Sequence, residues 1–187
     1  MSAAVPQRIP HRLKHYDYAE SGAYFITFCC YGRQAILGEI RDQSVVLNYL
    51  GRIDHKQIDR TNYLRRNAGV EITKYVVMPN HVHLLIDLVG SRCAVTAGGE
   101  AFGSPTKNTI PTIIRALKSS VTREARTVQV GGHGTPWPYD LWQSGYYDHV
   151  IRCRQEYLRV WQYIEENPAK WCEDRYYMEG ACRHDHS

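Results

Sequence analysis

The stretch Tyr75-Val-Val-Met-Pro-Asn-His-Val-His-Leu-Leu-Ile86 decides the fold, because it places two histidines inside an apolar run. Side chains alternate across a β-strand, so His81 and His83 point to the same face of a strand. The residues at the alternate positions point to the other face, where they can be buried: Val82, Leu84 and Ile86. Two imidazoles held on one face of a sheet form half of a metal site.

Spacing by itself leaves a second interpretation open, in which His81 and His83 belong to a polar face that binds no ion. The chain contains another pair with the same spacing, His184 and His186. That pair lies in the polar last residues of the chain, and chain termini are where order is least common. We expect only the pair at positions 81 and 83 to be functional.

Length and composition favour one domain. The chain has 187 residues, of which 43% are hydrophobic, enough for one core but little for a second. We expect a single domain over residues 16–176, preceded by a basic arm (residues 1–15) and followed by a flexible tail (residues 177–187). The formal net charge of +4 permits a polyanionic partner without requiring one.

The sequence indicates a cytoplasmic protein. Its N-terminus is polar and lacks the apolar segment of a signal peptide, and no run approaches the roughly 20 apolar residues of a membrane span. The six cysteines form no C-x-x-C pair. Cys172 and Cys182, with the histidines that follow them, lack the spacing of a zinc knuckle, so we expect reduced thiols and no structural zinc.

The first half of the chain is predicted to contain three strands and one helix. Runs of aromatic and β-branched residues mark the strands, at residues 24–31, 71–78 and 81–88. Pro79 and Asn80 favour a turn between the last two strands, so a hairpin places the histidines at the start of its second strand. Ser44 is a candidate N-cap for a helix that runs to about Arg66.

A second helix is predicted after residues 90–108, which are rich in small residues and are expected to form a mobile loop. Thr109 is a candidate cap, Pro111 falls in the first turn, and apolar residues recur at helical spacing along one side. Basic residues fall on the other side: Arg115, Lys118, Arg123 and Arg126. This basic stripe is either an ordinary solvated face or a DNA-binding surface that contacts phosphates.

The last predicted elements are a strand within residues 141–151 and a helix over residues 154–167. The resulting order is strand, helix, strand, strand, helix, strand, helix. It predicts an α+β fold with a ferredoxin-like antiparallel sheet and helices packed on one face. Such a sheet leaves its other face, or the helix ends, free for a ligand.

The final helix presents a phenol and an amide together. Tyr163 lies away from the apolar stripe of this helix, and Asn167, four residues later, shares its flank. Beside a metal ion, a tyrosine hydroxyl can attack a phosphodiester, and an amide oxygen is a suitable third ligand. Composition does not single out Tyr163, because the chain has 14 tyrosines and Tyr146 and Tyr147 have the same chemistry.

Three motifs in this order resemble those of the HUH single-tyrosine transposases, and most closely the branch of REP-associated tyrosine transposases. The motifs are Met78-Pro-Asn-His-Val-His-Leu-Leu85, Trp142-Gln-Ser-Gly-Tyr-Tyr-Asp-His-Val-Ile-Arg152 and Tyr163-Ile-Glu-Glu-Asn-Pro168. The resemblance runs from about Tyr24 to Trp171 and implies the HUH endonuclease fold. It further implies that Tyr163 is the nucleophile and that His81, His83 and Asn167 bind a divalent cation, usually Mg²⁺ or Mn²⁺.

The activity implied by the resemblance is nicking and rejoining of single-stranded DNA at the foot of a hairpin or palindromic repeat. The protein would act as a monomer or a homodimer, through a 5′-phosphotyrosine. Asp148 and His149 also match the branch, with no role that we can assign. The chain departs from the family at the loop of residues 90–108 and in the segment after Trp171, which match no motif of the family. It also departs at Asn167, where insertion-sequence members commonly carry glutamine.

Three other functions stay open at the level of sequence. A replication initiator or relaxase of the wider HUH group would use the same chemistry, often with a second tyrosine. A regulator that binds hairpin DNA without turnover would keep the DNA-binding surface but would not cleave the strand. A metal-dependent phosphohydrolase would use water in place of Tyr163.

Overall fold

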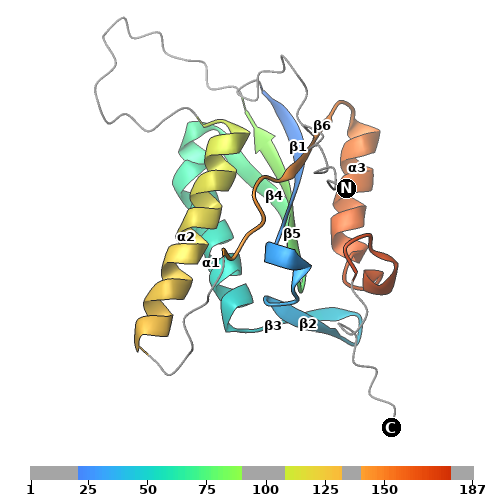
Figure 1. The fold of residues 1–187 in the computed structure, drawn as a ribbon. Coiled ribbons are helices and arrows are strands. Elements are labelled where there is room, and N and C mark those ends of the chain that lie inside the picture. The colour runs from blue at the N-terminus through green and yellow to red at the C-terminus, as the bar shows by residue number, and fades with distance from the viewer. Residues whose placement is uncertain (1–20, 90–107, 132–139, 178–187) are drawn as a thin grey trace, which may run out of the picture.

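A computed structural model describes residues 21–89, 108–131 and 140–177 of the chain. Figure 1 shows a central β-sheet with α1 and α2 on one side and α3 on the other. The predicted basic arm, most of the predicted loop at 90–108 and the tail after residue 177 lie outside the described residues. No helix within the described ranges is long and apolar enough to cross a lipid bilayer.

The central sheet is antiparallel throughout, as predicted, and has the strand order β4-β5-β1-β6. Its strands are β1 (Gly22–Cys29), β4 (Val70–Val77), β5 (His81–Leu88) and β6 (Tyr147–Ile151). With α1 and α2 between them, these strands form a ferredoxin-like βαββαβ unit. The hairpin between β4 and β5 turns at Pro79 and Asn80, which confirms that part of the prediction.

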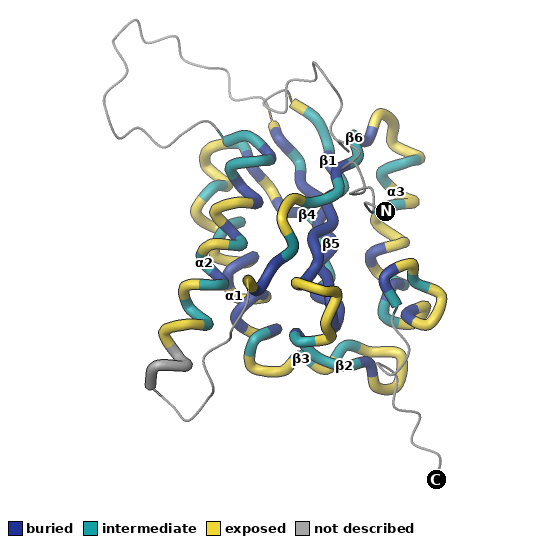
Figure 2. Tube along the Cα trace, viewed as in Figure 1, coloured by how far each residue is buried: buried dark blue, intermediate teal, exposed yellow. Residues whose placement is uncertain are grey.

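The helices occupy both faces of the sheet, whereas the sequence predicted one. The helices are α1 (Tyr49–Arg65), α2 (Ile110–Gly131) and α3 (Arg154–Glu166). On one face, Ile26 of β1 and Leu84 of β5 belong to a core that includes apolar residues of α1 and α2. On the other face, Leu85 packs with Ile164 of α3. The prediction was wrong because α3 follows the βαββαβ unit and packs on the face that this unit leaves open. Figure 2 shows largely buried strands between α1 and α2 on one side and α3 on the other.

A small hairpin precedes α1 where the sequence predicted the start of a helix. It consists of β2 (Gly38–Arg41) and β3 (Ser44–Leu47), so Ser44 begins a strand and caps no helix. Asp42 and Gln43 turn the chain with positive φ angles of 48° and 60°, and the β-branched residues after them suit a strand. The N-cap of α1 is Asn48, whose side chain accepts a hydrogen bond from the backbone N–H of Gly51.

Short 3-10 turns complete the described chain: Tyr31–Arg33, Arg66–Ala68 and Trp171–Glu173. The fourth predicted strand is shorter than expected, since only residues 147–151 join the sheet and Trp142 forms an isolated bridge to Cys30. Trp142 is buried, with its ring edge-on to that of Phe28.

A carboxyl group with no described hydrogen-bond partner is buried under α1. Asp54 is fully buried, and neither of its side-chain oxygens has a hydrogen-bond partner among the described residues. Burial raises the pKa of Asp54 from 3.8 to about 8, because the charged form is poorly solvated there. The folded protein therefore holds this group protonated at neutral pH.

We expect the contribution of Asp54 to the free energy of unfolding to fall as pH rises from about 4 to about 8. The unfolded chain loses the Asp54 proton near pH 3.8 and the folded chain near 8. Over this window the loss approaches roughly 5 kcal/mol at about 1.4 kcal/mol per unit. The Asp54→Asn variant does not titrate there, so its stability relative to wild type should rise with pH in denaturant unfolding. Asp59→Asn, at an exposed position of α1, is the control, and parallel profiles for wild type and Asp54→Asn would contradict the prediction.

Candidate metal centre and tyrosine

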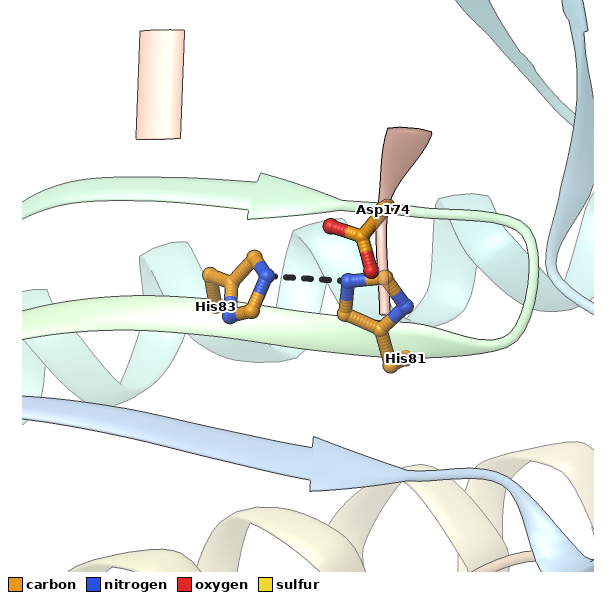
Figure 3. Close-up of side chains that lie close together, drawn as sticks. All are labelled: His81, His83 and Asp174. Carbon is orange, nitrogen blue, oxygen red and sulfur yellow. Dashed lines mark hydrogen bonds between the residues drawn. The ribbon is translucent and has the colours of Figure 1, made fainter. Parts of the chain in front are cut away.

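The two histidines of β5 lie on the face of the sheet that α3 covers. His81 pairs with Cys29 of β1 and His83 with Thr27, at positions that alternate with the apolar core residues. Both rings are buried, and their Nε2 atoms lie 2.9 Å apart (Figure 3). Two ring nitrogens thus converge on one point, as the His-x-His spacing predicts.

Asn80 determines which nitrogen of His81 is free to bind a cation. Its Nδ2 donates to the backbone oxygens of Arg33 (3.1 Å) and Tyr176 (2.8 Å), so its Oδ1 faces Nδ1 of His81 at 2.8 Å. An amide oxygen only accepts hydrogen bonds, so His81 carries its proton on Nδ1. Its Nε2 therefore presents a lone pair toward His83, as metal ligation requires.

Thr27 holds the outer nitrogen of the second ring. Its hydroxyl lies 2.7 Å from Nδ1 of His83. A hydroxyl can donate or accept, so His83 is able to protonate either nitrogen. With its proton on Nε2 it donates to His81, and with its proton on Nδ1 both Nε2 atoms are free for a cation.

Both imidazoles are held neutral. Burial, with a smaller effect of the Arg33 guanidinium, lowers the pKa of His81 to about 3. Burial also lowers the pKa of His83 well below its ordinary value, and the neighbouring His81 adds to the effect. Neutral imidazole is the form that binds metal, so the pair does not have to lose protons first.

Asp174 is the third member of the centre, and the sequence analysis did not find it. One ligand atom from each of His81, His83 and Asp174 lies within 4.8 Å of the others, and Figure 3 shows the carboxylate facing the two rings. Asp174 directly follows the turn at residues 171–173, in the segment that matches no motif of the resembled family. The only local signal was an acidic residue seven positions after Asn167. That spacing does not indicate whether the side chain faces the histidines.

Tyr163 reaches this centre from α3. Its hydroxyl lies 3.3 Å from Nε2 of His83 and donates to Oδ2 of Asp174 at 3.1 Å. The ring contacts Phe25 edge-on, and 40% of the residue is exposed, so it is accessible to a substrate. Burial and the Asp174 carboxylate raise the pKa of Tyr163, so the phenol is protonated at neutral pH in this arrangement.

Asn167 lies beside the carboxylate at the end of α3. Its Nδ2 donates to Oδ2 of Asp174 at 2.7 Å, and the residue is buried, with a relative exposure of 2%. Its Oδ1 is buried with no hydrogen-bond partner among the described residues. An unpartnered buried amide oxygen is costly unless a ligand satisfies it, and a cation would do so. Its role as a metal ligand remains a prediction that this oxygen supports.

The donor set fits a divalent cation. It combines two imidazole nitrogens and a carboxylate oxygen, and the amide of Asn167 is hydrogen-bonded to that carboxylate. Imidazole suits transition metals and carboxylate suits both Mn²⁺ and Mg²⁺, so ligand chemistry favours Mn²⁺ over Mg²⁺ for this set.

The predicted basic stripe lies in the helix layer on the opposite side of the sheet from the histidines. Arg115, Arg123 and Arg126 are exposed on α2, which packs on the sheet face away from the histidines. Lys118 differs from them, because its Nζ donates to the backbone oxygens of Gln143 and Gly145 and burial lowers its pKa to about 8. A cleft of about 530 Å³ runs along this part of α2, lined by Lys118, Ser119, Thr122, Arg123, Arg126, Thr127, Asp140, Leu141 and Trp142.

The residues matched on β6 divide between the two faces. His149 pairs with Phe25 on the α3 side, and its Nε2 lies 2.6 Å from Oε1 of Glu156 at the start of α3. Asp148 is buried, and its Oδ1 has no hydrogen-bond partner in the described part of the chain. His149 therefore links β6 to α3 and contacts neither histidine of the centre in any described interaction.

Comparison with known proteins shows a relative of this chain and a solved structure with a similar fold. No protein-family model matches it. A protein of Haemophilus influenzae, itself uncharacterized, is 33% identical over 192 residues, which cover 95% of this chain and 97% of the relative. The chain belongs to the same family as that protein. A solved structure of a REP-associated tyrosine transposase bound to a REP hairpin is similar to this chain in fold, with a TM-score of 0.51 and 22% sequence identity. That match covers 91% of this chain and 74% of the other. The fold expected from the three motifs is thereby confirmed.

We expect Asp174→Asn to weaken Mn²⁺ binding by about tenfold, because it replaces a charged ligand by a neutral one of the same shape. It should also lower the pKa of Tyr163, since the Asp174 charge raises it. Isothermal titration with Mn²⁺ measures the first effect, and a tyrosine pH titration without metal the second. Glu173→Gln removes an adjacent exposed charge and serves as control. Equal effects of the two variants would mean that Asp174 is no ligand.

Proposed function

We propose that the protein cuts and rejoins single-stranded DNA by transesterification at Tyr163, with Mg²⁺ or Mn²⁺ as cofactor. The observation that carries this proposal is the position of one hydroxyl group. The phenol of Tyr163 lies within 3.3 Å of His83 and 3.1 Å of Asp174, beside two convergent imidazoles. A nucleophile, a cation site and an accessible approach therefore occur together.

The residues that would hold the cation are His81, His83 and Asp174, with Oδ1 of Asn167 as a further donor. A divalent cation bound there supplies positive charge for a non-bridging phosphate oxygen and for the ionised phenol. The burial that keeps both imidazoles neutral also keeps competing water away from the ligand atoms.

In the proposed reaction, the phenolic oxygen of Tyr163 bonds to phosphorus and the bond from phosphorus to the 3′ oxygen breaks. Oδ2 of Asp174 accepts the phenol hydrogen bond and is placed to take its proton. The released 3′ oxygen takes a proton from solvent, which leaves a 5′-phosphotyrosine and a 3′-OH. One phosphodiester replaces another, so a second 3′-OH can reverse the step without ATP.

The proposed substrate is a strand that carries a hairpin or palindromic repeat. This choice is supported by the three motifs and by the REP hairpin bound to the structurally similar transposase. We propose that the exposed arginines of α2 contact hairpin phosphates, with a smaller contribution from Lys118, two of whose hydrogen bonds go to backbone oxygens.

A two-tyrosine mechanism of the relaxase type has less support. Tyr157 is the other tyrosine of α3, and its hydroxyl donates to Oδ2 of Asp87 at 3.0 Å and lies 2.9 Å from Oγ1 of Thr73. It is therefore engaged away from the histidines. The described part of α3 offers Tyr163 alone to the centre.

The test is a search for the covalent intermediate. The full chain is incubated with a labelled single strand containing a hairpin, with Mn²⁺ or Mg²⁺, and separated on a denaturing gel. We expect a labelled protein band that requires the cation and disappears with a chelator. Binding without any adduct would favour a regulator and would refute the proposed reaction.

A further inference from the structure

Two arginines from distant segments flank the metal centre. The guanidinium carbons of Arg33 and Arg175 lie 5.3 and 5.0 Å from the ring centroid of Tyr176. That ring lies 4.6 Å from the ring of His81. Arg175 also lies 5.9 Å from the ring centroid of Tyr147. Both guanidinium groups thus lie against the Tyr176 ring, which itself contacts His81.

Neither guanidinium group has a carboxylate partner at ion-pair distance among the described residues. The oxygens of the neighbouring Asp174 accept from Tyr163, Asn167 and the backbone N–H of Tyr176. A phosphate held by the two guanidinium groups would supply the missing counter-charge.

The backbone at Arg33 is held in an unfavourable conformation. Its φ angle is 56°, directly after Gly32 at 61°, and a residue with a Cβ rarely adopts the left-handed region. Its N–H bonds to the oxygen of Cys30, and its own oxygen accepts from Asn80. The same Asn80 amide orients His81 and donates a hydrogen bond to the backbone oxygen of Tyr176. One side chain therefore fixes a metal ligand and both segments that carry the arginines.

We propose that Arg33 and Arg175 bind phosphates of the DNA strand that flank the reacting phosphate at the metal centre. This inference rests on the proposed function and names the residues that hold its substrate. Guanidinium groups suit phosphate because their N–H donors match two oxygens at once. Stacking on Tyr176 orients both groups, and the contact is independent of base sequence.

The test uses variants of the full chain in a Tyr163→Phe background, which prevents covalent trapping. The variants are Arg33→Gly, Arg175→Ala and the control Arg60→Ala, an exposed position on α1 across the sheet. Arg33→Gly suits the positive φ angle, so it should fold at least as well as its parent. The probes are fluorescein-labelled (dT)15 in chelator, over a range of salt, and Mn²⁺ alone.

The expected effects on the two probes have opposite signs. Each of Arg33→Gly and Arg175→Ala should weaken (dT)15 binding by about tenfold and reduce the log-log salt slope by about 0.7, the value for one phosphate on a single strand. Each should tighten Mn²⁺ binding by about two- to fivefold, because a repelling charge is removed. A damaged site would weaken both ligands, and that result would overturn the inference.

Other outcomes separate this inference from the proposed function. If these variants bind (dT)15 as tightly as the parent, or if Arg60→Ala loses as much, the arginines hold no phosphate, although adduct formation would still support the tyrosine reaction. No binding of (dT)15 by the parent also overturns the inference. If wild type forms no adduct but the arginine variants show both expected shifts, the phosphate sites stand and the reaction does not.

Discussion

Tyr163→Phe is expected to reduce adduct formation and strand cleavage by at least about a thousandfold, because it deletes only the attacking oxygen. The phenyl ring keeps its contacts with Phe25 and His83, at centroid distances of 5.8 and 5.2 Å. The lost hydrogen bonds are partly exposed, so stability should change by less than about 1 kcal/mol. Denaturing gels measure the adduct, and titration of hairpin DNA and Mn²⁺ shows that both still bind.

The control for this variant is Tyr63→Phe, an exposed tyrosine of α1 on the opposite face of the sheet. It should leave the reaction unchanged. An adduct that survives in Tyr163→Phe would point to another tyrosine, of which Tyr176 is the nearest described to His81. Cleavage that survives without an adduct would mean that water attacks and that the protein is a phosphohydrolase.

His81→Ala is expected to abolish cleavage while hairpin binding stays within about threefold of wild type. It removes one of the two convergent nitrogens, so Mn²⁺ affinity should fall by about 100-fold or more. The fold should lose roughly 2–3 kcal/mol, since His81 is fully buried against Trp171 and Tyr176. Calorimetric titration of Mn²⁺, fluorescence anisotropy with hairpin DNA and denaturant unfolding measure the three effects.

A second substitution separates ligation from packing. His81→Phe keeps the ring volume but carries no ligand atom, so it should lose the cation with less damage to the fold. His55→Ala, at an exposed histidine of α1, should affect none of the three quantities. Equal losses of hairpin binding and metal binding in His81→Ala would mean that the histidines hold the fold and not an ion.

Asn80 shows how much of the centre depends on a residue that sequence reasoning treated as a turn former. The turn between β4 and β5 was predicted correctly, and so was the position of His81 directly after it. The Asn80 side chain makes three described contacts, to His81, Arg33 and Tyr176, the last 96 residues away. Turn propensity describes the local backbone and carries no information on such distant partners.

Ser44 and α3 illustrate two different reasons for error. At Ser44 the local signals competed, because a serine before apolar residues favours a helix start while two adjacent valines favour a strand, and the strand formed. For α3 the helix itself was predicted almost to the residue, at 154–167 against the observed 154–166. Only its choice of sheet face was wrong, and that choice is not encoded in the period of the helix.

The sequence by itself determined the strands of the central sheet, the three helices and the faces of their side chains, but not the β2–β3 hairpin. Alternation placed His81 and His83 together on β5, and the helical period placed Tyr163 and Asn167 on one flank of α3. Both follow from repeats of a few residues, which are local properties of the backbone. The tertiary structure alone decided that α3 covers the histidine face, that Tyr163 meets His83 across 80 positions, and that Asp174 turns back to join them. Those contacts depend on burying Ile164 of α3 against Leu85 of the sheet, and on the course of the turn at residues 171–173. Packing of this kind is a property of the whole chain, because it minimises the apolar area left exposed by all the elements together.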